Sequence, residues 1–282
     1  MMALAQRIAT WAAGQDAIRA IIVVGSQARR DHPADRWADL DLMMFVNDMT
    51  LYLGETAWLS NFGTLWLCLP FEQAGEEPQR LAVFEGGQKV DCHFFAVSEL
   101  VKMVEAGTLE DVYQRGYYAL IDKDGLVARL PPPSYVLPAQ NPPASDEFAL
   151  MVTRFWYEAL QTAKTIRRRD LWVVKGWDMG LKHTLLWFIA WHARAMNGWN
   201  HDTWHAGRFM LDWTDAETKQ ALDGLFGHFD PVDSWRALFA TITLYQHLAR
   251  EIALRLGYTY DVELEQRIGG LIRELYAEDG SG

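Results

Sequence analysis

A proline-rich stretch constrains this chain more than any other feature of its sequence. Six of the ten prolines lie between Pro131 and Pro143. Proline lacks an amide donor and has a restricted φ, so the stretch cannot form the interior of a helix or a central strand. We expect a connector over residues 131–144, with one domain over residues 1–130 and another over residues 145–282. A chain of 282 residues is long enough for two such domains.

Short segments with alternating apolar residues precede the connector. They are rich in β-branched and aromatic residues and are bounded by Gly, Asp, Pro or Asn, which is typical of β-strands. Gly86-Gly87 supplies positive φ and predicts a hairpin turn between the last two segments. Helices are expected over residues 3–19 and 97–106. The expected strands are Ile21–Val24, Leu40–Val46, Leu65–Leu69, Leu81–Phe84 and Val90–Phe95.

After the connector, the apolar residues recur with a period of about 3.6 residues, which is the period of an α-helix. From Phe148 to Ile166 they fall on one stripe, which predicts a helix packed against a core. Thr214 and Glu217 have the spacing of a capping box at a helix start. Further helices are expected over residues 175–196, 214–224, 233–256 and 261–276. The sequence thus predicts an α+β protein with an N-terminal sheet flanked by helices and a C-terminal helical bundle.

Charge and composition exclude several classes of protein. The net charge of −11 disfavours broad contact with nucleic-acid phosphates and favours cationic partners. Cys68 and Cys92 are the two cysteines, which argues against a disulfide framework and fits a reducing compartment. The longest strongly apolar run, Leu185 to Trp191, is too short to cross a membrane. The first residues lack the pattern of a secretory signal, so we expect a cytoplasmic protein.

One set of polar residues predicts a catalytic site. Asp39 and Asp41 open a predicted strand, and side chains two apart on a strand share a face. Asp91, on the hairpin strand Val90–Phe95, supplies a third carboxylate beside this pair. Like charges repel unless a cation lies between them, and Mg²⁺ combines one or two carboxylates with phosphate oxygens and water. Gly25 would let the backbone approach a phosphate, whose oxygens the Ser26 hydroxyl would hold.

This constellation resembles the signature of the nucleotidyltransferase superfamily typified by DNA polymerase beta. Within that superfamily the chain resembles the aminoglycoside 6-adenylyltransferases, the streptomycin-modifying enzymes. The resemblance extends in order over most of residues 1–276. It is carried by Asp39-Leu-Asp41-Leu-Met-Met-Phe45-Val46, Trp58-Leu-x-x-Phe62-Gly63, Lys89-Val-Asp91, Leu120-Ile-Asp122-Lys123-Asp124, Phe155-Trp156, Lys164, His183-x-Leu-Leu and Ala190-Trp191.

The resemblance implies a fold and a reaction. The N-terminal domain would have the mixed sheet of polymerase beta, and two Mg²⁺ ions held by Asp39, Asp41 and Asp91 would clamp the triphosphate of ATP. AMP would pass to a hydroxyl of streptomycin and release pyrophosphate, with Asp91 as a metal ligand that also shares the role of general base. Lys164 would contact the triphosphate across a cleft between domains, where the acceptor binds. The protein would act as a monomer.

Two departures from the family pattern leave the acceptor open. Gln27 replaces an arginine that often follows the serine, with Arg29 and Arg30 nearby, and residues 91–94 read Asp-Cys-His-Phe instead of aliphatic and threonine residues. Alternative acceptors are a lincosamide, a protein side chain and an RNA end, although the net charge disfavours RNA. A different class of function is also open: a module that binds nucleotide without turnover.

The histidines and tryptophans have simpler interpretations. His201 and His205 have a spacing that binds zinc when helical, but they lack the companion glutamate of the hydrolase motif. We interpret them as surface or capping residues, and His183 and His192 as core or cleft residues instead of ligands. Nine of the thirteen tryptophans lie from Trp156 onward, which suggests packing between helices.

Overall fold

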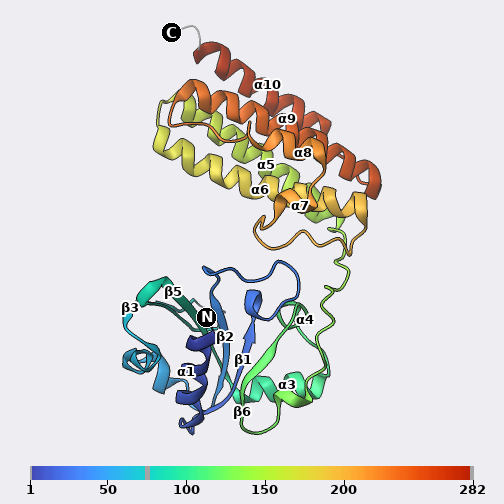
Figure 1. Cartoon of the computed structure of the whole chain (residues 1–282). Helices are drawn as coiled ribbons and strands as arrows, with labels where there is room; N and C mark the ends of the chain where they lie inside the picture. The colour runs from blue at the N-terminus through green and yellow to red at the C-terminus, as the bar shows by residue number, and fades with distance from the viewer. Residues whose placement is uncertain (1, 74–76, 280–282) are drawn as a thin grey trace. The chain divides into compact units, whose positions relative to one another are not determined.

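The computed structural model describes residues 2–73 and 77–279 of the chain (Figure 1). Contacts between residues separate two compact units, one up to Pro138 and the other from Ala139 onward. Each unit has a hydrophobic core of its own. The division falls within the proline-rich stretch, where the missing amide donors interrupt regular backbone hydrogen bonding.

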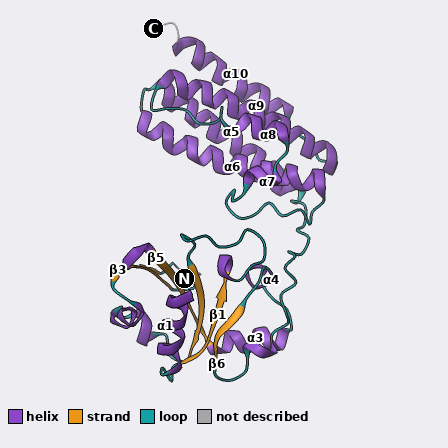
Figure 2. Cartoon of the chain, in the orientation of Figure 1, coloured by secondary structure: helices purple, strands orange, loops and turns teal. Residues whose placement is uncertain are grey.

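The first unit is built on a six-stranded sheet, drawn in orange in Figure 2. In the described residues its order is β3-β4-β5-β2-β1-β6. Strands β2 and β5 pair in parallel and the other neighbours pair antiparallel, so the sheet is mixed as predicted. The strands are β1 (Ile18–Val24), β2 (Leu40–Val46), β3 (Leu65–Phe71), β4 (Gln79–Phe84), β5 (Gln88–Ala96) and β6 (Tyr118–Asp122).

Apolar residues cover both faces of the central strands. Leu4 and Ile8 of helix α1 (Met2–Ala13) belong to the core on one face, together with alternate residues of β1, β2 and β5. On the other face, Leu100 and Tyr113 pack with the remaining alternate residues. This second core contains Met43, which lies two residues beyond Asp41 and therefore on the same side of β2. The remaining helices of this unit are α2 (Thr50–Leu53), α3 (Val97–Ala106) and α4 (Asp111–Gln114).

Four short 3₁₀ turns complete the first unit over residues 2–73 and 77–138. They are Gly25–Gln27, Ala57–Phe62, Glu85–Gly87 and Val127–Arg129. In the hairpin turn between β4 and β5, Gly86 and Gly87 both have positive φ, of 82° and 75°. The predicted hairpin is confirmed, because glycine adopts this backbone conformation without the clash that a Cβ would cause.

The second unit is a helical bundle (Figure 1). Its core brings together Phe155, Phe188 and Tyr245 from three different helices, and the rings of Phe188 and Tyr245 meet edge to face at 4.8 Å. In the described part of the chain, no helix combines the length and apolarity needed to cross a bilayer. The helices are α5 (Ser145–Arg167), α6 (Leu171–Asn197), α7 (Met210–Trp213), α8 (Ala216–Leu222), α9 (Pro231–Leu256) and α10 (Val262–Asp279).

Three expectations about local structure need correction. Helix α1 ends at Ala13 instead of residue 19, because the chain turns there and Ile18 already pairs with Val46. Strand β6 was not predicted, because its exposed edge position gives it no clear alternation of apolar and polar residues. The expected helix over residues 214–224 corresponds to α8 (Ala216–Leu222), and α7 (Met210–Trp213) precedes it.

The predicted capping box is the third correction. Asp215, and not Thr214, is the N-cap of α8: its carboxylate accepts a hydrogen bond from the Thr218 amide at 2.7 Å. The Thr214 hydroxyl donates instead to the carbonyl of Met210. Aspartate is as good a cap as threonine, so the sequence alone did not distinguish the two neighbours.

Candidate active site

Strand pairing brings the predicted acidic residues together. Asp41 of β2 lies directly opposite Asp91 of the parallel strand β5, and Asp39 lies just before β2. On the other side of β2, Asp41 pairs with Val24, the last residue of β1. The turn Gly25–Gln27 that follows β1 is therefore placed beside Asp41. We refer to Asp39, Asp41 and Asp91 as the carboxylate site.

Lys89 bridges two of these carboxylates. Its Nζ lies 2.6 Å from Oδ2 of Asp39 and 2.8 Å from Oδ2 of Asp91. Partial burial disfavours the charged ammonium, but hydrogen bonds to both carboxylates raise the pKa of Lys89 above its ordinary value. The lysine is therefore charged at neutral pH and offsets the repulsion between the carboxylates.

The other oxygen of Asp91 points to a cation site. Oδ1 of Asp91 is buried and has no hydrogen-bond partner among the described residues, and the side chain is 14% exposed. A buried carboxylate oxygen without a partner is costly. A divalent cation would satisfy it, and the oxygen donors of Asp39, Asp41 and Asp91 are the ligands that Mg²⁺ prefers. The residues present fit the metal that the sequence predicts.

Gly25 lets Asp41 approach the turn after β1. Its φ is +67°, and a Cβ at this position would overlap Oδ2 of Asp41. Any other residue would therefore displace the carboxylate and strain the backbone. The Gly25 carbonyl accepts hydrogen bonds from the amides of Ala28 and Arg29, both at 3.1 Å, which close the turn. Contact of Gly25 and Ser26 with a phosphate stays a prediction.

The loop after this turn is held by side chains that the sequence analysis singled out. Gln27, at the position where arginine was expected, donates from Nε2 to the carbonyl of Asp39 at 3.5 Å. The Arg29 guanidinium donates to the carbonyl of His32 from Nε at 3.0 Å and from Nη2 at 2.8 Å. The guanidinium of Arg30 lies over the ring of Tyr135 at 3.7 Å. These contacts order the loop that leads to Asp39.

Lys164 belongs to the second unit. It lies in the last turns of α5 and is half-buried. Its contact with the triphosphate stays a prediction.

Lys89 is the residue of this site to which sequence reasoning gave no role. A signal was present, because Lys89 precedes Asp91 by two residues and therefore lies on the same face of a strand.

The zinc spacing of His201 and His205 is not realised. The segment between α6 and α7 is not helical at these residues, and Nε2 of His201 lies 3.1 Å from the carbonyl oxygen of Trp213. His192 is buried as predicted, yet it contacts carboxylates and not only apolar residues.

Comparison with known proteins identifies the family. A family model described as streptomycin adenylyltransferase matches residues 1–275. The chain belongs to the streptomycin adenylyltransferase family. The predicted family is thus confirmed, as is the fold class of a mixed sheet with helices followed by a helical region. Membership places the chain among nucleotidyltransferases with ATP as co-substrate.

Individual members of the family are similar to this chain over most of their own length. The aminoglycoside 6-adenylyltransferase of Bacillus subtilis (strain 168) is 22% identical over 261 residues, which cover 89% of each protein. The aminoglycoside 6-adenylyltransferase of Staphylococcus aureus is 23% identical over 269 residues, or 92% of each protein. A crystal structure of an aminoglycoside 6-adenyltransferase from Bacillus subtilis aligns with 98% of this chain and 97% of its own, at 18% identity and a TM-score of 0.47.

Proposed function

We propose that this protein transfers AMP from ATP to the 6-hydroxyl of streptomycin and thereby confers resistance to the antibiotic. Family membership and the relatives named aminoglycoside 6-adenylyltransferases support the acceptor class. One structural observation carries the proposal: the parallel pairing of β2 and β5 sets Asp41 opposite Asp91, and Lys89 links Asp91 to Asp39. Three carboxylates gathered in this way are suited to phosphoryl-group chemistry.

Asp39, Asp41 and Asp91 would hold two Mg²⁺ ions in this proposal. When bound, Mg²⁺ neutralises charge on the α-phosphate and the departing pyrophosphate and lowers the pKa of the acceptor hydroxyl. Gly25 keeps the carboxylate of Asp41 in place by leaving room for it. Asp91 also shares the role of general base for the attacking hydroxyl, in addition to its role as a metal ligand.

Residues around the carboxylate site bind the nucleotide. The Ser26 hydroxyl and the backbone amides of the turn Gly25–Gln27 hold phosphate oxygens, for which successive amides in a tight turn are suited. Lys164 adds a positive charge to the triphosphate as a point charge on a long flexible side chain.

The acceptor is a polycation in this proposal. A net charge of −11 attracts an aminoglycoside with several amino or guanidino groups and raises its rate of encounter. The carboxylates of the site come from one chain, so we propose that a monomer is active. ATP is supplied inside the cell, so we place the reaction in the cytoplasm.

Labelled ATP tests the proposal. The protein is incubated with α-labelled ATP, Mg²⁺ and, separately, streptomycin, other aminoglycosides and a lincosamide. We expect label on streptomycin and release of pyrophosphate, with no label when Asp41→Asn replaces the wild type. Label on a different acceptor would contradict streptomycin as the acceptor but still support AMP transfer. Absence of label from every acceptor would contradict the transferase itself.

A further inference from the structure

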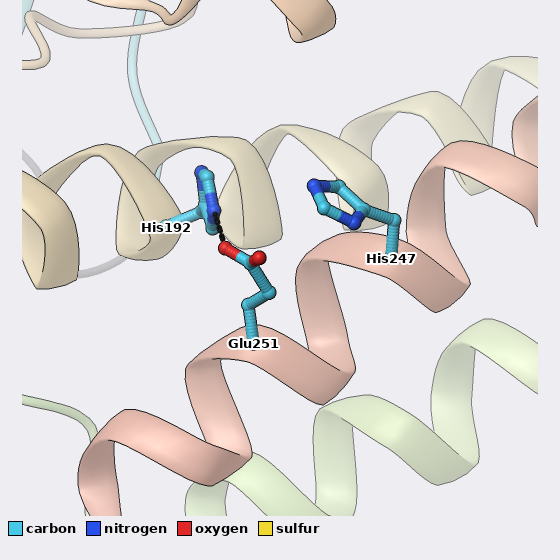
Figure 3. Close-up of side chains that lie close together, drawn as sticks. All are labelled: His192, His247 and Glu251. Atoms are coloured by element: carbon cyan, nitrogen blue, oxygen red, sulfur yellow. Dashed lines mark hydrogen bonds and ion pairs between the residues drawn. The ribbon is translucent and has the colours of Figure 1, made fainter.

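A second group of metal-binding side chains lies in the helical unit. His192 comes from α6, and His247 and Glu251 come from successive turns of α9 (Figure 3). One ligand atom from each residue lies within 4.8 Å of the other two. We refer to these three residues as the histidine cluster. It shares no residue with the carboxylate site.

Helix packing holds the cluster together. His247 and Glu251 are four residues apart and therefore on the same face of α9. Phe188 lies one turn before His192 on α6 and meets Tyr245 of α9 in the core. The spacing of the two helices at the cluster is therefore set by buried aromatic rings.

His192 is placed as metal-binding histidines are. Its side chain is only 4% exposed, and its Nε2 lies 2.8 Å from Oε2 of Glu251, the contact drawn as a dashed line in Figure 3. On the opposite edge of the ring, Nδ1 lies 3.4 Å from Oδ2 of Asp215. Histidines that bind metals generally have a carboxylate or carbonyl partner on the second nitrogen, which fixes the ring. Asp215 is fixed in turn, because it caps α8 through Thr218.

His247 has a partner of the same kind. Its Nε2 lies 3.6 Å from Oε2 of Glu217, which belongs to the first turn of α8. Each histidine of the cluster thus has an outer carboxylate in addition to Glu251. Both outer carboxylates come from the start of α8, although the two histidines come from different helices.

The charges of the cluster favour a divalent cation. Glu251 supplies a carboxylate beside the two imidazoles, and Arg255 lies one turn further along α9. Asp215 and Glu217 add two further acidic groups, one beside each histidine. With neutral imidazoles, the three carboxylates carry more charge than Arg255 offsets, and a divalent ion would reduce the repulsion between them.

We propose that His192, His247 and Glu251 bind Zn²⁺, with Asp215 and Glu217 as the outer carboxylate partners of the two histidines. Two nitrogens and one carboxylate oxygen are donors that suit zinc and leave one tetrahedral position for water. Mg²⁺ prefers oxygen donors and belongs to the carboxylate site. Tetrahedral ligands of zinc lie about 3.4 Å apart. Rotation of the half-exposed side chains of His247 and Glu251 closes the remaining gap.

Zinc in this position would join α6 to α9 directly and to α8 through Asp215 and Glu217. Because the ligands are assembled only in the folded helical unit, zinc would stabilise that unit against unfolding.

Zinc titration of the full chain tests this proposal. The background carries Asp39→Asn and Asp91→Asn, so that the carboxylate site does not compete for the metal. We expect one Zn²⁺ per chain by calorimetry and two imidazole nitrogens on the zinc by X-ray absorption. Zinc at a hundred times its dissociation constant should raise the Tm by about 5 °C or more.

Matched variants identify the ligands. We expect His247→Gln and Glu251→Gln each to weaken zinc binding by about 10²-fold, and Glu217→Gln, which removes only an outer partner, by about tenfold. His228→Gln is the control, because His228 is 92% exposed and also contacts an aspartate, yet lies outside the cluster. Circular dichroism checks that each variant is folded. The proposal is overturned if no zinc binds, if the bound zinc lacks imidazole nitrogens, or if His247→Gln and His228→Gln bind equally.

Discussion

The carboxylate site and the histidine cluster bring together side chains by different means. Backbone pairing of β2 and β5 sets Asp41 opposite Asp91, so a period of two in the sequence already indicates which side chains share the site. The histidine cluster depends on how α6, α8 and α9 pack, and its residues are separated by up to 59 positions. A site made by strand register is visible in the sequence, whereas a site made by helix packing is not.

The two sites also differ in their donors. The carboxylate site offers oxygen atoms and contains a lysine that offsets their charge. The histidine cluster offers two imidazoles and a carboxylate, each histidine with its own acidic partner. The comparison predicts that damage to one site leaves metal binding at the other unchanged.

Substitution of Asp41 is expected to have the largest effect on catalytic activity. Asp41→Asn should lower kcat for AMP transfer on the order of 10³-fold, because an amide is a poor ligand for the cations that stabilise the transition state. Asp39→Asn should act in the same direction. Steady-state assays with labelled ATP measure the loss. The Tm and zinc binding of both variants should match the wild type, and full activity in either variant would refute the mechanism.

Two glycine-to-alanine variants distinguish the effect of backbone strain from the effect of displacing the Asp41 carboxylate. Gly25→Ala should lower kcat by about 10²-fold, because the added Cβ overlaps Oδ2 of Asp41. Gly86→Ala is the control: its φ is +82°, but nothing lies within 4 Å of the added Cβ. The control should lose about 1 kcal/mol of stability and keep its activity. Equal activity of the two variants would show that Gly25 does not position Asp41.

Lys164 tests whether the helical unit takes part in nucleotide binding. Lys164→Ala should raise the KM for ATP roughly tenfold with little change in kcat, because a charge on the triphosphate contributes to binding before and during the reaction. Arg168→Ala, in the exposed segment after the same helix, should leave the KM unchanged. An unchanged KM in Lys164→Ala would remove this residue from the site.

Substitution of Lys89 is expected to have the smallest effect, and this effect is on the affinity for Mg²⁺. Its ammonium occupies Asp39 and Asp91 oxygens that a cation would bind, so Lys89→Met should strengthen Mg²⁺ binding about threefold in the absence of ATP. Calorimetric titration with MgCl₂ measures the change. Lys102→Met, which breaks an exposed pair with Glu99, is the control and should show no change. Weaker Mg²⁺ binding in Lys89→Met would contradict this competition.

The first site was largely predictable because its information is local. The predicted strand Leu40–Val46 coincides with β2, and the alternation of Val90–Phe95 correctly placed Asp91 and Cys92 on opposite faces. The bridging role of Lys89 was not predicted, because strand alternation shows which face a lysine shares but not which acids it contacts.

The second site was not predictable for a physical reason. Spacing drew attention to His201 and His205, but their segment is not helical. His192 was interpreted as a core or cleft residue, since an apolar helix sequence does not reveal which carboxylates of other helices pack against it. Helix phase and crossing geometry decide such contacts.

The sequence also did not predict which tryptophans are buried. Trp156, Trp191, Trp213 and Trp235 are buried, which confirms core packing for these four. Trp172 is 80% exposed, so packing does not explain it. It lines an open pocket of about 650 Å³ on the helical unit, together with Val173, Lys175, Gly176, Trp177 and Phe229. Composition indicated large rings without showing which of them face solvent.

The alternation of β5 limits how this hairpin can vary in length. Deletion of one residue between Gly87 and Asp91 would bring Cys92 opposite Asp41 and turn the acidic side chain toward the opposite core. Loss of two residues would return Asp91 to its original face but bring His93 opposite Asp41. The site therefore depends on both the face and the register of β5, so designed variants should keep the number of residues between Gly87 and Asp91.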